Sequence, residues 1–590
     1  MYILGYSGID GYLKYKNGHI VNLTLHESYV SQGMDAAAAL LRNGEIIAAS
    51  AEERFTGEKH TGTFPMHAIQ ACLDAAGIGM KDIDVVAHNF NYDQYKELFE
   101  LNDYTSGLFH NALSTESQVN LFKKHFNIDV TAIFEAHDHH DTHAVYAFET
   151  SGYSSSLVIV ADGLGEFTSI SVYDASPDEM RLLKSYGPTS SLGMLYSAIT
   201  DYLGFVTNSD EYKIMGMAAY GDPKPFKSFF ENLVTLGDEG SIEIHHLIPA
   251  EIKSPLDRET YRYFKEWLSS QVFESRNPDA QVEQVHKDFT AALQERLNEA
   301  MVHLASYWQQ KTKHNNLCLA GGVALNCVAN AVIARQEIFK QLYIGPASAD
   351  DGTSLGSALL SAKNRHILLD HKHHMEMPFY GPEITLDPLN KIIVENNLTV
   401  EELNTNDLLE TVAREILDNK IIAWTQDNME FGPRALGNRS ILANPRDYTM
   451  RERLNTVTKQ RESFRPFAPL VKEDAINDYF ETIEGVVYKH MLVNADVRPV
   501  HRDNLQAVTH HDGTARVQSV NKKDLPLIWG LLDKVEERSG IPILLNTSYN
   551  LKSMPIVCYE NDALQSFIDS DLDILVINNL LIRKTDKILC

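Results

Sequence analysis

The sequence predicts an α/β protein with a duplicated unit in its N-terminal part. The chain opens with a short apolar strand at residues 2–6, and a strand, an Asn-Gly turn and a second strand follow at residues 36–50. This is a strong hairpin pattern. Residues 157–175 repeat the device around a glycine-rich turn. Sequence with helical spacing follows each opening, as at residues 66–76.

Ribonuclease-H-like pairs of the actin and sugar-kinase superfamily are built from two such units, with nucleotide bound between the halves. We therefore assign residues 1–363 to a domain of this class. Residues 364–395 are rich in histidine and contain proline and glycine, which predicts a linker. Residues 396–590 form a second α/β domain, in which residues 421–424 read as a strand.

The composition is that of a globular protein with a strongly acidic surface. The 590 residues suffice for two to four domains. A formal charge of −28 disfavours nucleic acid and anionic membranes as partners, unless cations gather in one cleft. The sequence shows no signal peptide and no apolar run of about 18 residues. The five cysteines are scattered and form no CxxC pair, so we expect a cytoplasmic protein.

A histidine-rich segment predicts a metal site. If residues 138–148 are helical, His139 and His143 lie on one face, with Cβ atoms about 5–6 Å apart. Asp162 ends the following strand and could complete a set of ligands with open positions for substrate. Asp351 follows a later strand and is a candidate fourth ligand. The alternative is a cluster of surface histidines without a metal.

A pair of glycines follows a buried strand at residues 317–320. Gly321 and Gly322 precede a helical stretch, so backbone amides could approach phosphate or ribose at the N-terminus of a helix. A tight turn between strand and helix, with no ligand, explains the same pattern equally well.

The second domain concentrates positive charge in an otherwise acidic chain. Arg434 lies in a loop rich in glycine and proline, and Lys459 and Arg465 follow it. These three residues predict an anion pocket, because an arginine side chain can donate two parallel hydrogen bonds to a phosphate and a lysine adds a positive charge. Residues 514–518 and 544–550 are strand ends with hydroxyl and amide side chains, which suit a small hydrogen-bonding group or further phosphate.

At these positions the chain resembles the O-carbamoyltransferase family, which includes the nodulation-factor, cephamycin and tobramycin carbamoyltransferases. The resemblance runs from about residue 35 to the C-terminus and rests on many stretches in the same order. They are residues 52–56 with 59–60, 139–144, 162–166, 211–216, 319–326, 350–352, 429–440, 465–469 and 546–548.

The resemblance implies a two-step reaction that begins in a C-terminal domain similar to the YrdC fold. Carbamoyl phosphate would lose phosphate there, and the carbamate would attack the α-phosphorus of ATP to give carbamoyl-adenylate and pyrophosphate. The residues that this resemblance assigns to carbamoyl phosphate and ATP are Arg434, Arg439, Lys459, Arg465, His510, Arg516, Asn546, Thr547 and Ser548.

For the N-terminal domain the resemblance implies a glycoprotease-like fold that transfers the carbamoyl group to a hydroxyl of a small-molecule acceptor. His139, His143, Asp162 and Asp351 would bind a divalent metal, iron(II) in the family, with magnesium possible alongside ATP. The metal would act as a Lewis acid. The residues that would hold the intermediate are Lys59, Gly163, Lys213, Gly321, Gly322 and Asn326.

One position departs from the family pattern. The family commonly has histidine before the aspartate that precedes the first small-residue strand, and here that position is Met34, ahead of Asp35. If the histidine helps to deprotonate the acceptor, another base is needed, and the candidates are Asp35, His60 and His140. Residues 9–32 look irregular and longer than usual, and we expect them to shape the acceptor site.

Three other functions fit parts of the sequence. Threonylcarbamoyl transfer to tRNA uses relatives of both domains, but the acidic surface argues against RNA. A sugar-kinase-like phosphotransferase leaves the metal residues and the cationic second domain without a role. A nucleotide-binding regulator without activity is disfavoured, because candidate residues are present at both sites.

Overall fold

The computed structural model describes residues 1–369, 375–385, 396, 398–459, 461–462 and 464–585. The chain forms two compact units. The first contains Met1–Thr56 and His60–Met375, and the second contains Gly57–Lys59 and Glu376–Cys590. The boundary at Met375 falls inside the predicted linker, part of which lies outside the described residues. In the described part of the chain, no helix is both long and apolar enough to cross a membrane.

The first unit contains two five-stranded sheets of the same topology. In one sheet the order is β3-β2-β1-β4-β5, and in the other it is β8-β7-β6-β11-β12. β1 and β6 are each antiparallel to one neighbour and parallel to the other. The strands are β1 (Tyr2–Ser7), β2 (Ala37–Arg42), β3 (Glu45–Ala51), β4 (Val85–His88), β5 (Phe134–Ala136), β6 (Ser156–Ala161), β7 (Ile170–Ala175), β8 (Met180–Tyr186), β11 (Asn316–Ala320) and β12 (Gln341–Ile344).

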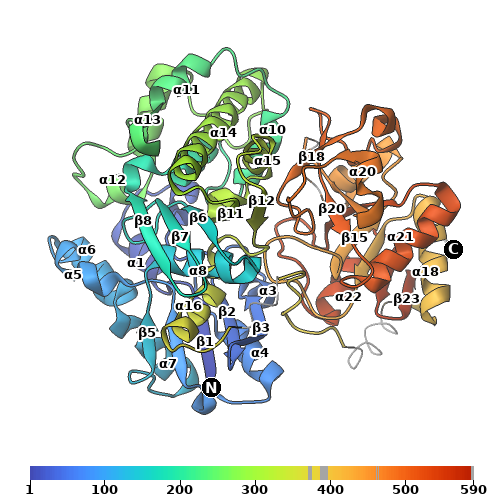
Figure 1. Ribbon diagram of the computed structural model, residues 1–590, viewed down its shortest axis with the longest axis horizontal. Coiled ribbons are helices and arrows are strands. Elements are labelled where there is room, and N and C mark those ends of the chain that lie inside the picture. Colours follow the sequence, from blue (N-terminus) through green and yellow to red (C-terminus); the bar gives the residue numbers. More distant parts are fainter. Residues whose placement is uncertain (370–374, 386–395, 397, 460, 463, 586–590) are drawn as a thin grey trace. The chain divides into compact units, whose positions relative to one another are not determined.

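Two helices lie between these sheets and pack on each other (Figure 1). Helix α8 (His139–Ser151) contacts β6 and β11, and helix α16 (Asp350–Asn364) contacts β1 and β2. Two glycines allow this close packing. A Cβ on Gly5 would lie 2.0 Å from the carbonyl oxygen of Ser354, and one on Gly356 would lie 2.0 Å from that of Thr142.

The outer helices of the first unit agree with the hydrophobic pattern of the sequence. Helix α4 (Met66–Ala76) packs against β2 and β3, as the apolar spacing at residues 66–76 predicts. Helix α14 (Gln284–Thr312) contacts α10 (Glu211–Ala218) and α15 (Cys327–Arg335).

The prediction of irregular structure for residues 9–32 is wrong. The segment contains α1 (Tyr12–His19) and α2 (Leu25–Tyr29). Helix α1 buries Lys16, whose Nζ donates to two backbone carbonyls, so it lacks a readable apolar stripe. Helix α2 begins with a capping box formed by Thr24 and Glu27, a Thr-x-x-Glu signal that the sequence does carry.

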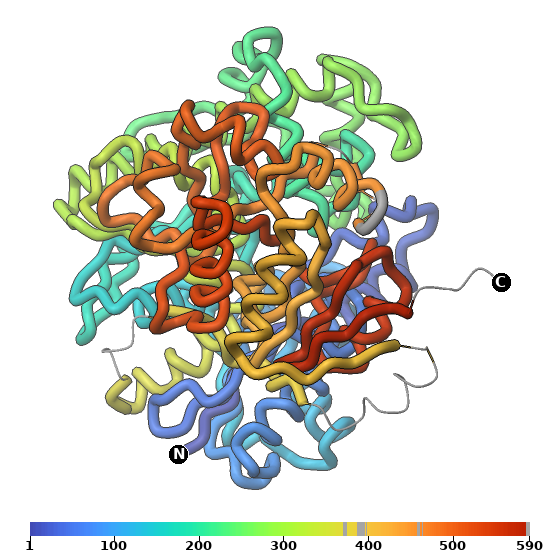
Figure 2. The backbone as a smooth tube through the Cα atoms, turned by 90° about the vertical axis from the view of Figure 1, so that its right-hand side faces the viewer, coloured from blue at the N-terminus to red at the C-terminus, as the bar shows by residue number. Residues whose placement is uncertain are grey.

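The second unit is built on an eight-stranded sheet. Its order is β13-β23-β22-β14-β15-β21-β16-β20. Helices α18 (Thr405–Leu417) and α21 (Pro526–Ser539) pack on each other, and their apolar residues join those of the sheet in one core; α18, yellow-orange, faces the viewer in Figure 2. The strands are β13 (Leu398–Glu402), β14 (Ile422–Thr425), β15 (Arg439–Ala443), β16 (Ala468–Lys472), β20 (Gln518–Val520), β21 (Ile543–Ser548), β22 (Ile574–Ile577) and β23 (Leu580–Lys584).

A smaller three-stranded sheet completes this unit. Strand β18 (Asn494–Val497) lies between β17 (Phe480–Glu481) and β19 (Thr514–Arg516). Both of its pairings are antiparallel, and Asn494 is opposite Arg516. This pairing places one residue that the sequence assigns to phosphate, Arg516, at the end of β19.

Candidate metal centre and anion-binding loop

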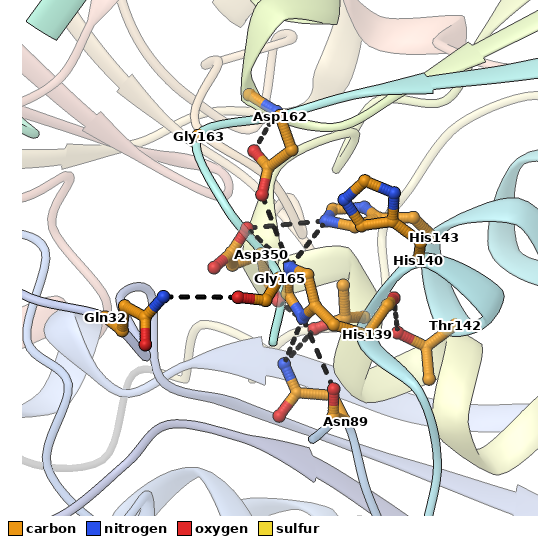
Figure 3. A network of polar contacts seen from close by, with 12 residues as sticks. Gln32, Asn89, His139, His140, Thr142, His143, Asp162, Gly163, Gly165 and Asp350 are labelled. Atoms are coloured by element: carbon orange, nitrogen blue, oxygen red, sulfur yellow. Dashed lines mark hydrogen bonds and ion pairs between the residues drawn. The ribbon is translucent and has the colours of Figure 1, made fainter. Parts of the chain in front are cut away.

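Four side chains from three elements converge in the first unit (Figure 3). His139 and His143 come from the first turns of α8, Asp162 follows β6, and Asp350 is the first residue of α16. One ligand atom from each residue lies within 4.8 Å of all the others, so the four could hold one metal ion. We call these four residues the metal cluster. The three ligands predicted from the histidine spacing and the strand end are therefore brought together.

The distances fit a site for one divalent cation. His139 Nε2 lies 3.2 Å from His143 Nε2 and 3.4 Å from Asp162 Oδ2. Asp350 Oδ1 lies 3.6 Å from His139 Nε2 and 3.4 Å from His143 Nε2. Burial alone would lower the pKa of His139, but the two carboxylates raise it well above its usual value. Two imidazoles and two carboxylates are a donor set that iron and similar metals accept.

The fourth residue of this cluster is Asp350, not Asp351 as the sequence suggested. Successive residues of a helix point about 100° apart, so only one of the two can face the histidines. The Asp351 carboxylate turns inward and accepts from the backbone N–H of Gly352 at 3.0 Å. Burial, together with the charge of Asp35, raises the pKa of Asp351 to about 8.

Two of the three candidate bases form a pair. His60 Nδ1 lies 2.8 Å from Asp35 Oδ1, and Glu53 accepts from the backbone N–H of His60 at 2.9 Å. The third candidate, His140, is held differently. Its Nδ1 lies 2.8 Å from the hydroxyl of Ser171 on β7, and burial lowers its pKa well below the usual value.

The glycine pair after β11 serves the metal cluster. Gly321 has a φ of +86°, and a Cβ there would lie 2.3 Å from the carbonyl oxygen of Ala161. The N–H of Gly322 donates to Asp162 Oδ1 at 2.8 Å. Asn326 caps α15 by accepting from the N–H of Ala329 at 3.0 Å. The turn alternative from the sequence accounts for these contacts.

The remaining residues that the resemblance assigned to the carbamoyl-adenylate intermediate differ in what they contact. A Cβ on Gly163 would meet nothing within 4 Å, so the space beside this glycine is open. The side-chain amides of Asn326 and Gln294 donate to each other, so both the oxygen and the nitrogen of the Asn326 amide are hydrogen-bonded within the protein. Lys213 pairs with Asp210 at 2.9 Å. Lys59 belongs to the short segment grouped with the second unit.

In the second unit, Arg439 does not have the phosphate-binding position that the resemblance assigned to it. The residue is fully buried. Its guanidinium donates to the backbone carbonyls of five residues, so no N–H remains for a phosphate. The acceptors are Cys558, Gln426, Asn438, Pro382 and Asp427.

The ammonium group of Lys459 likewise forms its hydrogen bonds within the protein. Its Nζ donates to the carbonyl oxygen of Ser548 at 2.5 Å and to the carbonyl and side-chain oxygens of Asn550 at 2.8 and 2.7 Å. Burial and the neighbouring charges of Arg461 and Arg465 lower its pKa well below the usual value. Lys459 therefore fixes the chain after β21 instead of presenting a charge to a ligand.

The loop that carries Arg434 is moulded by a buried carboxylate. Glu430 Oε1 accepts from the backbone N–H groups of Leu436 and Asn438, both at 2.8 Å, and of Arg439 at 3.2 Å. The amide of Asn546 donates to the carbonyl of Ala435 at 3.0 Å. Asn546, also assigned to ligand, thus supports this loop.

The other assigned residues of the second unit lie nearer its surface. Arg434, Arg465, Arg516, Thr547 and Ser548 are all partly exposed. His510 is also partly exposed, and its Nδ1 lies 3.2 Å from the hydroxyl of Thr514. Burial of its ring lowers the pKa of His510 to about 4.

Several residues of these sites were not singled out from the sequence. Asp350 was hidden by its neighbour Asp351, although the paired carboxylates at a helix start were visible. Asn89, whose carbonyl oxygen lies 3.3 Å from His139 Nδ1, follows a strand that carries no motif. Glu430 lies inside a recognised stretch, but nothing in its spacing reveals a carboxylate that binds its own loop.

Comparison with known proteins identifies the class. The family descriptions Carbamoyltransferase N-terminus and Carbamoyltransferase C-terminus match residues 30–359 and 413–584. The chain belongs to the carbamoyltransferase family and is an enzyme of that class.

Its relatives include proteins named for nodulation and one named for O-carbamoyl transfer. Nodulation protein NolNO of Sinorhizobium fredii is 34% identical, over 93% of this chain and 79% of its own. Nodulation protein NolO of Bradyrhizobium diazoefficiens is 35% identical, over 76% and 79%. The 3'-hydroxymethylcephem-O-carbamoyltransferase of Amycolatopsis lactamdurans is 30% identical, over 58% and 59%.

Solved structures align only weakly with the chain. The activator of the 2-hydroxyisocaproyl-CoA dehydratase from Clostridium difficile covers 62% of this chain and 95% of its own, at 12% identity and a TM-score of 0.29. A score this low supports no argument about the fold.

Proposed function

We propose that this carbamoyltransferase activates carbamoyl phosphate with ATP in its second unit and transfers the carbamoyl group to a small-molecule hydroxyl in its first. The observation that supports this most directly is the convergence of His139, His143, Asp162 and Asp350. We further infer that the two sheets of equal topology are duplicated ribonuclease-H-like halves and that the second unit is YrdC-like.

The metal cluster would hold a divalent cation, for which iron(II) is the first candidate. A bound cation would supply Lewis acidity toward the carbamoyl carbonyl. The residues of the chain supply the positioning. Asp162 is fixed through Gly322, and the open space beside Gly163 leaves room for a substrate group next to the cluster.

The Asp35–His60 pair is the proposed base. Asp35 Oδ1 lies 2.8 Å from His60 Nδ1. In the proposed reaction Asp35 keeps the proton on Nδ1, and Nε2 is the atom that takes a proton from the substrate hydroxyl. The acceptor oxygen would attack the carbamoyl carbon while its proton passes to His60 Nε2. The bond from this carbon to the adenylate oxygen would break, and AMP would leave.

In the second unit, Arg434, Arg465 and Arg516 are the proposed anion-binding residues. Water would hydrolyse carbamoyl phosphate to carbamate and phosphate, and a carbamate oxygen would then attack the α-phosphorus of ATP with loss of pyrophosphate. Glu430 shapes the loop that carries Arg434 through three backbone N–H groups. The fixed loop would reduce the ordering needed when the ligands bind.

The first half-reaction can be tested without the acceptor. Purified protein is incubated with ATP, carbamoyl phosphate and Fe²⁺, with Mg²⁺ added in a parallel series, and pyrophosphate and AMP are measured. We expect pyrophosphate that requires carbamoyl phosphate and is lost in Arg434→Ala. Formation of ADP would instead indicate phosphoryl transfer, and absence of turnover under all conditions would contradict the activation step.

A further inference from the structure

One of the two histidines in the metal cluster is held far more firmly than the other. His139 Nδ1 lies 3.3 Å from the backbone oxygen of Asn89, and the ring of Phe90 stacks on the His139 ring, with centroids 4.2 Å apart and planes 8° apart. His143 Nδ1 is buried and has no hydrogen-bond partner among the described residues.

The carbonyl of Asn89 selects the useful form of His139. The Asn89 amide nitrogen also lies 3.4 Å from Nδ1, but it makes a shorter bond, of 2.7 Å, to the Thr353 hydroxyl. We therefore assign the proton to Nδ1, which donates it to the Asn89 carbonyl, so that Nε2 keeps its lone pair for the cluster. The stacked Phe90 ring prevents rotation about the last side-chain bond. The ring of His139, a residue of α8, is therefore oriented by the segment that follows strand β4 of the first sheet.

A buried carboxylate ties this segment to the backbone of α8. Glu166 Oε1 accepts from the N–H of Asn91 at 2.8 Å and from the N–H of His139 at 3.2 Å. Its Oε2 lies 3.3 Å from the same His139 nitrogen. Glu166 is 8% exposed and lies four residues after Asp162. One side chain thus connects the loop that follows β4, the start of α8 and the loop that carries Asp162.

The same segment also reaches the helix that supplies Asp350. The amide of Asn89 donates to the hydroxyl of Thr353 at 2.7 Å, and this hydroxyl donates to the carbonyl of Asp350 at 2.5 Å. Asn89 is fully buried. The segment Asn89–Asn91 therefore contacts both helices that carry metal-cluster residues.

We propose that Glu166 and the segment Asn89–Asn91 form a brace that fixes His139 as the preformed ligand of the metal centre. Glu166 is a positioning residue in this arrangement, because it acts on the backbone of His139 and not on the cation. His143, without such support, is the ligand that adjusts to the cation. This proposal rests on the proposed metal function of the cluster.

The experiment titrates metal-free full-length protein with Co²⁺ alone, by calorimetry and by visible absorption. Groups that orient a metal ligand without contacting the metal typically contribute about 10–100-fold to metal affinity. We expect Glu166→Ala and Phe90→Leu each to lose Co²⁺ affinity by a factor in this range. Glu166→Gln should stay near the wild type, because its remaining carbonyl oxygen can accept both N–H groups that Oε1 accepts now.

The matched control is Glu149→Ala. Glu149 is also a buried glutamate, 7% exposed, but it lies near the other end of α8 and pairs with Lys363 at 2.8 Å. We expect this variant to lower the melting temperature of the metal-free protein while its Co²⁺ affinity and absorption spectrum stay unchanged.

The outcomes separate the brace from the metal function. If wild-type protein binds no Co²⁺, the metal function and the brace both fail. If it binds and Glu166→Ala or Phe90→Leu binds as tightly, the brace alone is wrong. Should Glu166→Ala not fold, Phe90→Leu and the recovery in Glu166→Gln decide the question. If Glu166→Gln and Glu149→Ala lost as much Co²⁺ affinity as Glu166→Ala, the effect would be one of general stability, and the proposal would be wrong.

Discussion

Gly322 and Asp162 are joined by a hydrogen bond that determines which carboxylate oxygen faces the metal cluster. The Gly322 N–H donates to Oδ1 at 2.8 Å, and Oδ2 is the oxygen that lies 3.4 Å from His139 Nε2. The glycine pair after β11 thus orients a metal-cluster residue, whereas its sequence left open either a contact to phosphate or a tight turn without a ligand.

The neighbours Asp350 and Asp351 should respond very differently to substitution by asparagine. Asp350→Asn removes a carboxylate from the cluster, and we expect at least about a 100-fold loss of Co²⁺ affinity. Asp351→Asn should bind metal like the wild type, because a pKa of about 8 keeps the Asp351 carboxyl mostly protonated at neutral pH. Calorimetry measures both, and equal losses would contradict the assignment.

Gly193 should be intolerant of any side chain. It lies in α9 (Leu192–Tyr202), and a Cβ there would lie 2.7 Å from both the carbonyl oxygen of Asp162 and the N–H nitrogen of Gly163. We expect Gly193→Ala to cost about 1–3 kcal/mol of unfolding free energy and to weaken metal binding. Gly187→Ala is the control, since nothing lies within 4 Å of that position. Similar melting curves for the two variants would refute the steric argument.

Arg439 and Arg434 should separate stability from activity. Arg439→Met leaves five carbonyls without their donor, three of them in buried bonds, and a loss of at least about 3 kcal/mol is expected from such unpaired groups. Arg434→Ala should lower pyrophosphate formation while the melting temperature changes little. A stable Arg439→Met protein that lacks only activity would restore the phosphate-binding role to Arg439.

His510 should make the second unit sensitive to mild acid. Its folded pKa is about 4, below the unfolded value near 6.5, so the unfolded chain binds the proton first as the pH falls. Stability is therefore complete above pH 6.5 and decreases toward pH 4, by up to about 3 kcal/mol. In His510→Gln this part of the pH dependence should vanish. The check is a series of melting curves from pH 7 to pH 4, and parallel curves for both proteins would disprove it.

The sequence predicts regular elements well where periodicity and burial agree. Residues 66–76 are clear because their apolar residues repeat at helical spacing. Helix α1 was missed because buried polar contacts of Lys16 replace an apolar stripe, whereas helix α2 was missed although its Thr-x-x-Glu capping signal is present in the sequence. Local patterns do not report which distant carbonyl a lysine will reach.

The metal cluster was predictable for the same local reason, and its limits are local too. His139 and His143 are spaced for one helix face, whereas the choice between Asp350 and Asp351 depends on where α16 begins and how it is rotated against α8. For Arg439 and Lys459, residue type suggests phosphate binding. Their burial against backbone carbonyls depends on strands far apart in the chain, which the sequence does not reveal.

The dispersion of the metal-cluster residues along the chain has a consequence for biosynthesis. His139, His143 and Asp162 leave the ribosome long before Asp350, which begins helix α16. Domains generally fold as units during synthesis, so the complete cluster cannot exist until α16 has emerged and packed between the two sheets. Nascent chains stalled before residue 350 should therefore lack the high-affinity site, and metal would enter only a unit that has already folded.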